Sequence, residues 1–345
     1  MKTIKIDLLS HAHHLNQPLT GFHRWAKRNG YRLDIRDCTR GSEYRMKKTA
    51  LAVTVDGCRL VYDLADGYQS PEAMEYLLDR CDFYFKRSFS ESVNASMGYR
   101  NVYPYGLYCD VTWAGNPLLR KRKLGLPRTA AEAACGKLVT PETLERPAKP
   151  DAGGEPRVLF QAVLWPADPR LTPEENEERA EICRTRIRLV RQLRETFGGR
   201  FSGGLRDDPA TAEMARDLAL PARLTRRKDY LEIMKKSAVC VASAGLHGST
   251  GGKFGEYVSA GRAIVSERLR YTVPGPFAAG ENYLEYATPE ECAEQVRFLL
   301  AHPEKIRSMQ ENNRAYTRDF LSPERLVRNT LETAGILPPE KGTNP

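Results

Sequence analysis

The sequence predicts an α/β protein of two domains. The chain has 345 residues, more than one compact core usually holds, so two domains are the default expectation. Short apolar runs that are typical of strands alternate with helical patterns along both halves, which indicates mostly parallel sheets. Residues 143–156 between the halves are rich in Pro, Gly and charge, a composition typical of a linker. We therefore place one domain at residues 1–150 and the other at residues 151–337.

The N-terminal half is expected to begin with a strand and a helix that Gly30 ends, because glycine is common just after a helix. A hairpin follows, since Asp56-Gly57 between two β-rich runs is a strong turn signal. This hairpin interrupts an otherwise parallel sheet. The expected elements are strands at 3–9, 51–55, 58–63, 82–86 and 101–105 and helices at 21–29 and 71–80.

The C-terminal half restarts the alternation and ends in helices. Its long helix is acidic in its first part and rich in arginine in its second, which suits the helix dipole, so these arginines need no ligand. Thr288 and Glu291 form a capping box around Pro289, which starts a helix. The expected elements are strands at 158–164, 238–242 and 263–265 and helices at 172–197, 252–261, from 289, from 303 and from 323.

Composition narrows the class of protein. None of the eight cysteines lies in a C-x-x-C pair, which argues against a thiolate metal site. No run approaches the roughly 20 apolar residues that cross a bilayer. The N-terminus alternates as a strand does and lacks the apolar stretch of a signal peptide, so we expect a cytoplasmic protein.

The formal net charge of +9 fits a nucleic acid, an anionic membrane surface or an anionic small substrate as the partner. The basic run from Arg120 to Lys123 has no interleaved aromatic residues to stack on bases, so no nucleic-acid partner is expected. The alternatives for this run are a solvated loop and peripheral contact with an anionic membrane at its inner face.

The most informative pattern lies in residues 237–267. A short apolar strand, a loop rich in Gly, Ser and Thr and a new helix follow one another. In a parallel sheet such a loop lies at the carboxyl ends of the strands, where ligands bind. The glycines allow the backbone to approach a ligand, and the helix presents its free N–H groups to an anion. Lys253 and Glu256 share one face of that helix, where a lysine suits a phosphate and a carboxylate suits two ribose hydroxyls. A surface ion pair between these two residues is the alternative.

Residues 252–265, GKFGEYVSAGRAIV, resemble the K-x-x-E-Y-x-A-x-G-x-P/A-I-V signature of the group 1 glycosyltransferases, and the resemblance covers residues 226–331. It implies a GT-B fold, in which two Rossmann-like domains face each other across a cleft and the C-terminal helices cross back to the first domain. It also implies that Lys253 faces the diphosphate of a nucleotide-sugar donor and that Glu256 holds the ribose. The full set expected to bind the donor is Gly245, His247, Gly248, Ser249, Thr250, Gly251, Gly252, Lys253, Glu256 and Tyr257.

Two positions depart from the family pattern. Gly248 stands where the retaining branch has a second Glu, which leaves the stereochemistry open. Val163 and Leu164 stand where the family has an Arg at the end of the first strand of this domain. We expect Arg170 or Lys228 to supply the missing positive charge.

Three of the six histidines, His11, His13 and His14, directly follow the first strand. An imidazole there can take the proton of an acceptor hydroxyl in an inverting transferase, whereas no Cys or distal His completes a zinc site. Asp66 in an Asp-Gly turn is the rival base. The alternatives are solvated loop histidines and an ordinary turn.

These patterns predict a glycosyltransferase that needs no metal and no cofactor. It would transfer a sugar from a nucleotide-sugar donor to a hydroxyl of a glycan, a lipid-linked intermediate or a small molecule. One alternative is a sugar-nucleotide epimerase of the same fold. The other is a basic, non-catalytic protein that binds nucleic acid or an anionic surface.

Overall fold

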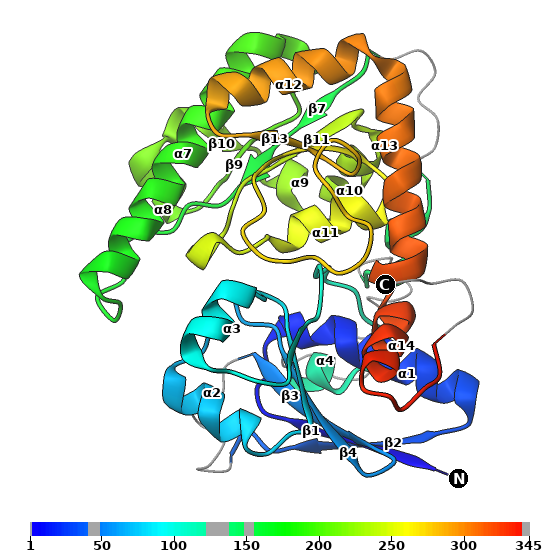
Figure 1. Cartoon of the computed structure of the whole chain (residues 1–345). Helices are drawn as coiled ribbons and strands as arrows, with labels where there is room; N and C mark the ends of the chain where they lie inside the picture. The colour runs from blue at the N-terminus through cyan, green and yellow to red at the C-terminus, as the bar shows by residue number, and fades with distance from the viewer. Residues whose placement is uncertain (1, 41–48, 122–137, 148–154, 340–345) are drawn as a thin grey trace. The chain divides into compact units, whose positions relative to one another are not determined.

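The computed structural model describes residues 2–40, 49–121, 138–147 and 155–339. The chain divides into two compact units (Figure 1). Unit 1 comprises Met1–Thr143, Arg270–Pro276 and Tyr316–Pro345, and unit 2 comprises Leu144–Leu269 and Phe277–Ala315. Several predictions concern residues outside the described ones: the middle of the expected linker (148–154), the end of the basic run (122–123), and Cys135.

Unit 1 is built on a six-stranded mixed sheet with the order β2-β1-β3-β4-β5-β6. The predicted hairpin is confirmed: β3 and β4 pair antiparallel, and Asp56 and Gly57 at the turn have φ of 48° and 89°. β2 was not predicted, because its residues RLDIRD are mostly polar and only partly buried. The strands are β1 (Thr3–Leu8), β2 (Arg32–Asp37), β3 (Ala50–Val55), β4 (Cys58–Asp63), β5 (Phe83–Lys86) and β6 (Val102–Pro104).

Helices cover both faces of this sheet. On one face α1 (Asn16–Asn29) and α14 (Pro323–Thr333) lie side by side (Figure 1), and their apolar residues share a core with alternate residues of the strands. α2 (Pro71–Leu78) packs on the other face. Gly21 lets α1 approach α14 closely, since a Cβ there would overlap the carbonyl of Pro323. The expectation that the last helix packs on the N-terminal domain is therefore confirmed.

The remaining helices of unit 1 are short. They are η1 (His13–Leu15), α3 (Glu91–Met97) and α4 (Pro117–Lys121), with α6 (Pro141–Glu145) at the boundary of the two units and a π-helix (Thr317–Leu321) before α14. Gly30, which follows α1, has the left-handed conformation that the sequence predicts, with φ of 70°.

Unit 2 contains two fully parallel sheets, with the orders β13-β12-β11-β7 and β10-β9-β8. The predicted strand 158–164 is divided between them, because its first residues pair with β11 and its later ones with β9. The strands are β7 (Val158–Leu159), β8 (Gln161–Ala162), β9 (Gly204–Arg206), β10 (Ala219–Leu220), β11 (Val239–Ala242), β12 (Ala263–Glu267) and β13 (Leu284–Tyr286).

The long helix of unit 2, α7, begins at a full capping box between Thr172 and Glu175. It packs against α12, whose N-terminal cap is Thr288, over a core that includes residues of β11 and β12. The helices are α7 (Pro173–Phe197), α8 (Pro209–Met214), α9 (Ala222–Thr225), α10 (Arg227–Lys236), α11 (Gly252–Ser259), α12 (Pro289–Ala301) and α13 (Pro303–Tyr316). The predicted fold class, an α/β protein of two Rossmann-like units, is confirmed.

Among the helices that the structure describes, none combines the length and the apolar character that crossing a membrane requires.

Candidate functional site

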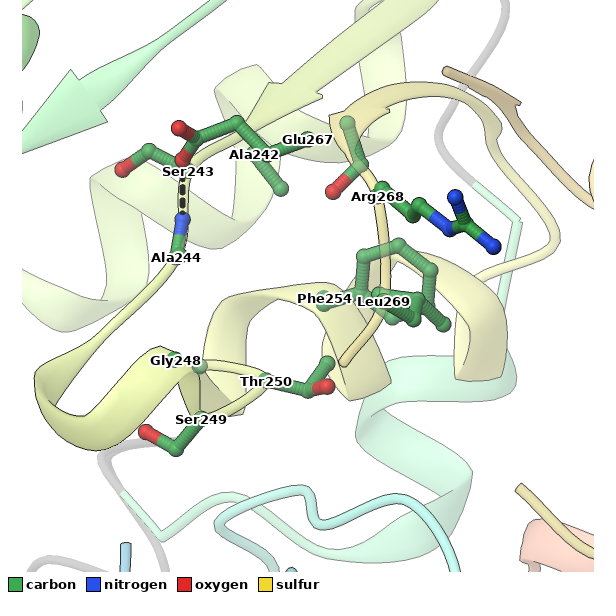
Figure 2. Close-up of a pocket in the computed structure, with 12 residues that line it drawn as sticks. Ala242, Ser243, Ala244, Gly248, Ser249, Thr250, Phe254, Glu267, Arg268 and Leu269 are labelled. Atoms are coloured by element: carbon green, nitrogen blue, oxygen red, sulfur yellow. Dashed lines mark hydrogen bonds between the residues drawn. The ribbon is translucent and has the colours of Figure 1, made fainter. Parts of the chain in front are cut away.

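A pocket lies in unit 2 where β11 and β12 end (Figure 2). Because the two strands are parallel, the loop of residues 243–251 that leaves β11 and the chain that leaves β12 meet at the same edge. The pocket contains four of the residues predicted to bind the donor. Its lining residues are Ala242, Ser243, Ala244, Gly248, Ser249, Thr250, Gly251, Phe254, Ser266, Glu267, Arg268 and Leu269.

Two carboxylates fix the backbone of the loop 243–251. Glu267 on β12 accepts a hydrogen bond from the N–H of Ala244 at 2.5 Å (Figure 2). Glu178 on α7 accepts one from the N–H of His247 at 2.5 Å and lies 3.4 Å from its Nδ1. His247 has a φ of 58°, a conformation that non-glycine residues adopt rarely. Hydrogen bonds to Glu267 and Glu178 therefore fix the backbone of the loop, and the side chain of His247 lies beside Glu178.

Arg186 on α7 donates hydrogen bonds to the same loop and to the residue that follows β8. Its Nη1 donates to the carbonyl of Val163 at 2.7 Å, its Nη2 to the carbonyl of Ala244 at 3.2 Å, and its Nε to Ser243 Oγ at 3.3 Å. The residue is only 8% exposed, and burial lowers the pKa of its guanidinium to about 10. Because the helix dipole accounts for the arginines of this helix as a group, Arg186 was not among the predicted site residues.

A sequence signal for Arg186 was present. It lies three residues after Cys183 and four before Val190, both buried, so it falls on the apolar face of the helix. A charged residue at such a position is rarely buried without a partner. Arg184, two residues earlier, is exposed and pairs with Glu177 and Glu181 along α7, as the dipole argument expects.

Lys253, at the start of α11, is largely enclosed. Its Nζ donates to the carbonyl of Gln161, the first residue of β8, and lies 5.1 Å from the centre of the Tyr230 ring. Burial lowers the pKa of Lys253 to about 8. The charge of Glu256 opposes this shift, whereas those of Arg186, Arg227 and Arg206 add to it.

Glu256 is paired with Arg227 rather than with Lys253. The carboxylate is almost fully buried, and the guanidinium grips it as a fork, with Nη2–Oε1 of 2.6 Å and Nη1–Oε2 of 2.9 Å. A bidentate pair of this kind fixes the orientation of the carboxylate. Arg227, the first residue of α10, was not among the predicted site residues.

The other predicted donor residues lie in different surroundings. Tyr257 is fully buried in the core. Arg170 pairs with Asp168 at 2.7 Å and its side chain is 85% exposed. Lys228 is exposed on α10. The arginines whose charges act on Lys253 are instead Arg186, Arg206 and Arg227.

Charges of both signs surround Lys253. The charges of Arg186, Arg227 and Arg206 lower its pKa, and the charge of Glu256 opposes this shift. Each of these arginines also has a carboxylate nearby: Arg227 pairs with Glu256 at 2.6 Å, Arg206 pairs with Asp208 at 3.0 Å, and the charge of Glu267 acts on Arg186. Charges in a partly buried site of this kind interact more strongly than in water.

The predicted histidines lie in two different places of unit 1. His11 Nε2 is 3.1 Å from Asp37 Oδ1 at the end of β2. The rings of His13 and His14 are 4.2 Å apart, and His14 lies 5.0 Å from the ring of Tyr108.

His14 belongs to a cluster with Asp66. Burial lowers the pKa of His14 to about 4, with His13 and Arg87 adding to the shift and Asp66 and Asp110 opposing it. Arg87 is buried and forms an ion pair with Asp66. Arg87 also lies 5.8 Å from the centre of the Tyr108 ring, against which His14 packs, so Tyr108 and Arg87 connect His14 to Asp66. With a pKa near 4, His14 is neutral at pH 7.

A buried charge pair supports this cluster. Asp63 and Lys86 are the last residues of β4 and β5; their side chains are fully buried, 3.0 Å apart. Asp63 also accepts from Tyr84 Oη at 2.7 Å, from Gln69 Nε2 at 3.2 Å and from the N–H of Ala65 at 2.9 Å. These bonds hold the turn that carries Asp66, a role that the sequence analysis did not identify. In the part of the chain that the structure describes, no three His, Cys, Asp or Glu residues are placed to share a metal ion.

Residues 184–332 match the model of a family described as glycosyl transferase-like. This stretch includes β11, the loop, α11 and the last helices, and it confirms the resemblance to the group 1 glycosyltransferases. No curated protein sequence matches the chain at a significant level.

Solved structures resemble the chain over most of its length. HepE of Anabaena, solved with UDP and glucose, is 11% identical, with 98% of this chain and 100% of that chain covered and a TM-score of 0.48. MnaA of S. aureus, solved with UDP, is 10% identical over 100% of both chains, with a TM-score of 0.47. A putative UDP-N-acetylglucosamine 2-epimerase from Listeria monocytogenes is 10% identical over 97% of both chains, with a TM-score of 0.47.

Proposed function

We propose that this protein is a glycosyltransferase that moves a sugar from a nucleotide-sugar donor to an acceptor hydroxyl without a metal ion. One observation carries the proposal: Lys253, on whose pKa the charges of three arginines act, lies in the first turn of the helix that follows a glycine-rich loop, inside the stretch that matches the glycosyl transferase-like family. The acceptor would be a glycan, a lipid-linked intermediate or a small molecule.

In this proposal unit 2 binds the donor. Lys253 and the N-terminus of α11 face the diphosphate, because both are positively charged and attract its negative charge. Glu256 accepts hydrogen bonds from the ribose hydroxyls. Each of its oxygens accepts one bond from Arg227 and retains further acceptor capacity, since a carboxylate offers about four lone-pair directions. Arg227 would hold the carboxylate in the orientation that the ribose requires.

The same cations would support the leaving group. When the bond between the sugar and the diphosphate breaks, negative charge grows on the diphosphate, and fixed cations stabilise it without rearrangement. This role is the one that a divalent metal fills in other transferases, and we propose that Lys253 and its neighbouring arginines fill it here.

Unit 1 would supply the base. We propose that one of His13, His14 and Asp66 takes the proton of the acceptor hydroxyl. His14 is neutral at pH 7 and so has a free nitrogen lone pair, although its pKa near 4 makes it a weaker base than an ordinary imidazole. The carboxylate of Asp66 is held by Arg87. His11, which pairs with Asp37, belongs to a different place on the sheet.

A thermal-shift panel tests the donor half of the proposal. Sugars carried on UDP, GDP, ADP and CMP are added singly to the full chain, and at least one diphosphate sugar should raise the melting temperature, because a ligand that binds only the folded state stabilises it. The stabilising donor is then incubated with and without acceptors. Turnover that needs an acceptor supports glycosyl transfer. Conversion of the donor alone into its epimer would show that the protein is an epimerase instead. If none of these nucleotide sugars raises the melting temperature, the proposal is contradicted.

A further inference from the structure

We propose that Arg186 is the positioning residue of the donor site: it connects the loop of residues 243–251 to the end of β8. The inference rests on the proposed function, and it extends that function to a residue on α7, outside the glycine-rich segment.

Three contacts carry the proposal. The guanidinium of Arg186 reaches the carbonyl of Val163, just beyond β8, and the carbonyl of Ala244 and the hydroxyl of Ser243, just beyond β11. One side chain therefore joins the ends of two strands that belong to different sheets. The end of β11 borders the pocket, and β8 contains Gln161, whose carbonyl Lys253 contacts. By joining the two strand ends, Arg186 sets the spacing between the loop and Lys253.

The burial of Arg186 shows that these contacts are specific. A guanidinium loses much of its hydration when it is buried, and the loss is tolerated only where acceptors replace the water. Each of the three nitrogens of Arg186 has an acceptor of the protein. The guanidinium also lies 4.3 Å from the ring centre of Trp165, an arrangement that favours arginine over lysine.

Arg186 also brings charge to the site. Val163 and Leu164 occupy the strand end where the resembling family carries an Arg, and the guanidinium of Arg186 lies against the carbonyl of Val163 at 2.7 Å. A cation therefore occupies this strand end although it comes from a different element. Its charge, like those of Arg227 and Arg206, lowers the pKa of Lys253, and the charge of Glu256 opposes this shift.

The experiment compares four chains: wild type, Arg186→Met, Arg186→Lys and Arg262→Met. Arg262 is the matched control, because its guanidinium also caps backbone carbonyls of unit 2, those of Lys235 and Ser237, but at the opposite end of β11. Each protein is titrated by calorimetry with the stabilising nucleoside diphosphate and with the bare nucleoside. Amide hydrogen exchange of residues 243–251 is measured without ligand.

Arg186→Met should weaken diphosphate binding about ten- to hundredfold, as expected for a charged hydrogen-bonding group, and nucleoside binding less than about threefold. Amide exchange in the loop should become faster. Arg186→Lys keeps the charge but not the three-way contact, so it should recover part of the diphosphate affinity and none of the exchange protection. Arg262→Met should lower the melting temperature and leave both ligands and the loop unchanged.

A pH series separates this role from a general loss of packing. The charge of Arg186 helps to lower the pKa of Lys253, so in Arg186→Met the pH above which diphosphate affinity falls should move upward, whereas Arg186→Lys and Arg262→Met should keep the wild-type midpoint. Wild-type diphosphate affinity in folded Arg186→Met, or equal losses of diphosphate affinity in Arg186→Met and Arg262→Met, would overturn this inference but not the proposed function. Failure of the wild-type chain to bind any nucleotide would overturn the proposed function with it.

Discussion

Replacing Glu256 tests whether its carboxylate binds a ligand or only holds Arg227. In the structure both oxygens accept from Arg227, at 2.6 and 2.9 Å, and the residue is 3% exposed. Glu256→Ala removes the proposed ribose acceptor. Loss of even one hydrogen bond to a charged group, worth about 1.5–3 kcal/mol, should weaken donor affinity about ten- to hundredfold. Glu256→Gln retains the shape and one acceptor, so its effect should be smaller.

Stability changes must be separated from affinity, because Glu256→Ala also leaves Arg227 without its carboxylate. The Arg227 side chain is 35% exposed, so water replaces part of the lost interaction with the carboxylate. In a unit of this size, each kcal/mol of lost folding stability lowers the melting temperature by about 2–4 °C. Glu332→Ala in unit 1 is a matched control, since Glu332 is a largely buried carboxylate that pairs with Arg328 at 2.7 Å. Calorimetric titration at a temperature where all variants are folded decides the question. Wild-type donor affinity in folded Glu256→Ala would refute the reasoning and leave a purely structural ion pair.

Three further predictions follow from the site. Diphosphate affinity should fall as the pH rises through about 8, because Lys253 is charged only below its pKa; titrations from pH 6 to 10 check this, and an affinity constant over that range would contradict it. Activity should persist in excess EDTA, and abolition that Mg²⁺ or Mn²⁺ reverses would contradict the metal-free mechanism. Replacing the base among His13, His14 and Asp66 by Ala should lower kcat about 10²–10⁴-fold and leave donor affinity unchanged, whereas His11→Ala should stay near wild type. Near-normal rates in all three variants would show that the base lies elsewhere or that the mechanism is retaining.

Local signals in the sequence predict much of the fold. The Asp56-Gly57 turn, the cap at Thr288 and the glycine at position 30 each act through neighbouring residues, and each is present where the sequence placed it. β2 was missed because its burial pattern has no clear apolar alternation. The strand at 158–164 appeared continuous because its division depends on which strands lie beside it, and the local sequence does not specify them.

The site was predicted less completely than the fold, because its side-chain contacts join distant residues. Lys253 and Glu256 were identified from one short segment. Their surroundings come from Arg227, 29 residues before Glu256, and from Arg186, 58 residues before Ala244. The charge pair of Asp63 and Lys86 likewise forms only when β4 and β5 align in register. Pairings of this kind are set by tertiary packing, which residue spacing in the sequence does not reveal.

In the proposed function, Lys253 and its neighbours recognise the diphosphate of a nucleotide-sugar donor. The most direct measurement is a calorimetric comparison of wild type and Lys253→Ala, each titrated with the best nucleoside diphosphate and with the corresponding nucleoside. The wild-type chain should prefer the diphosphate by at least about tenfold, which corresponds to about 1.4 kcal/mol, and Lys253→Ala should lose most of that preference while binding the nucleoside as before. An equal preference in both proteins, or none in the wild type, would contradict the account.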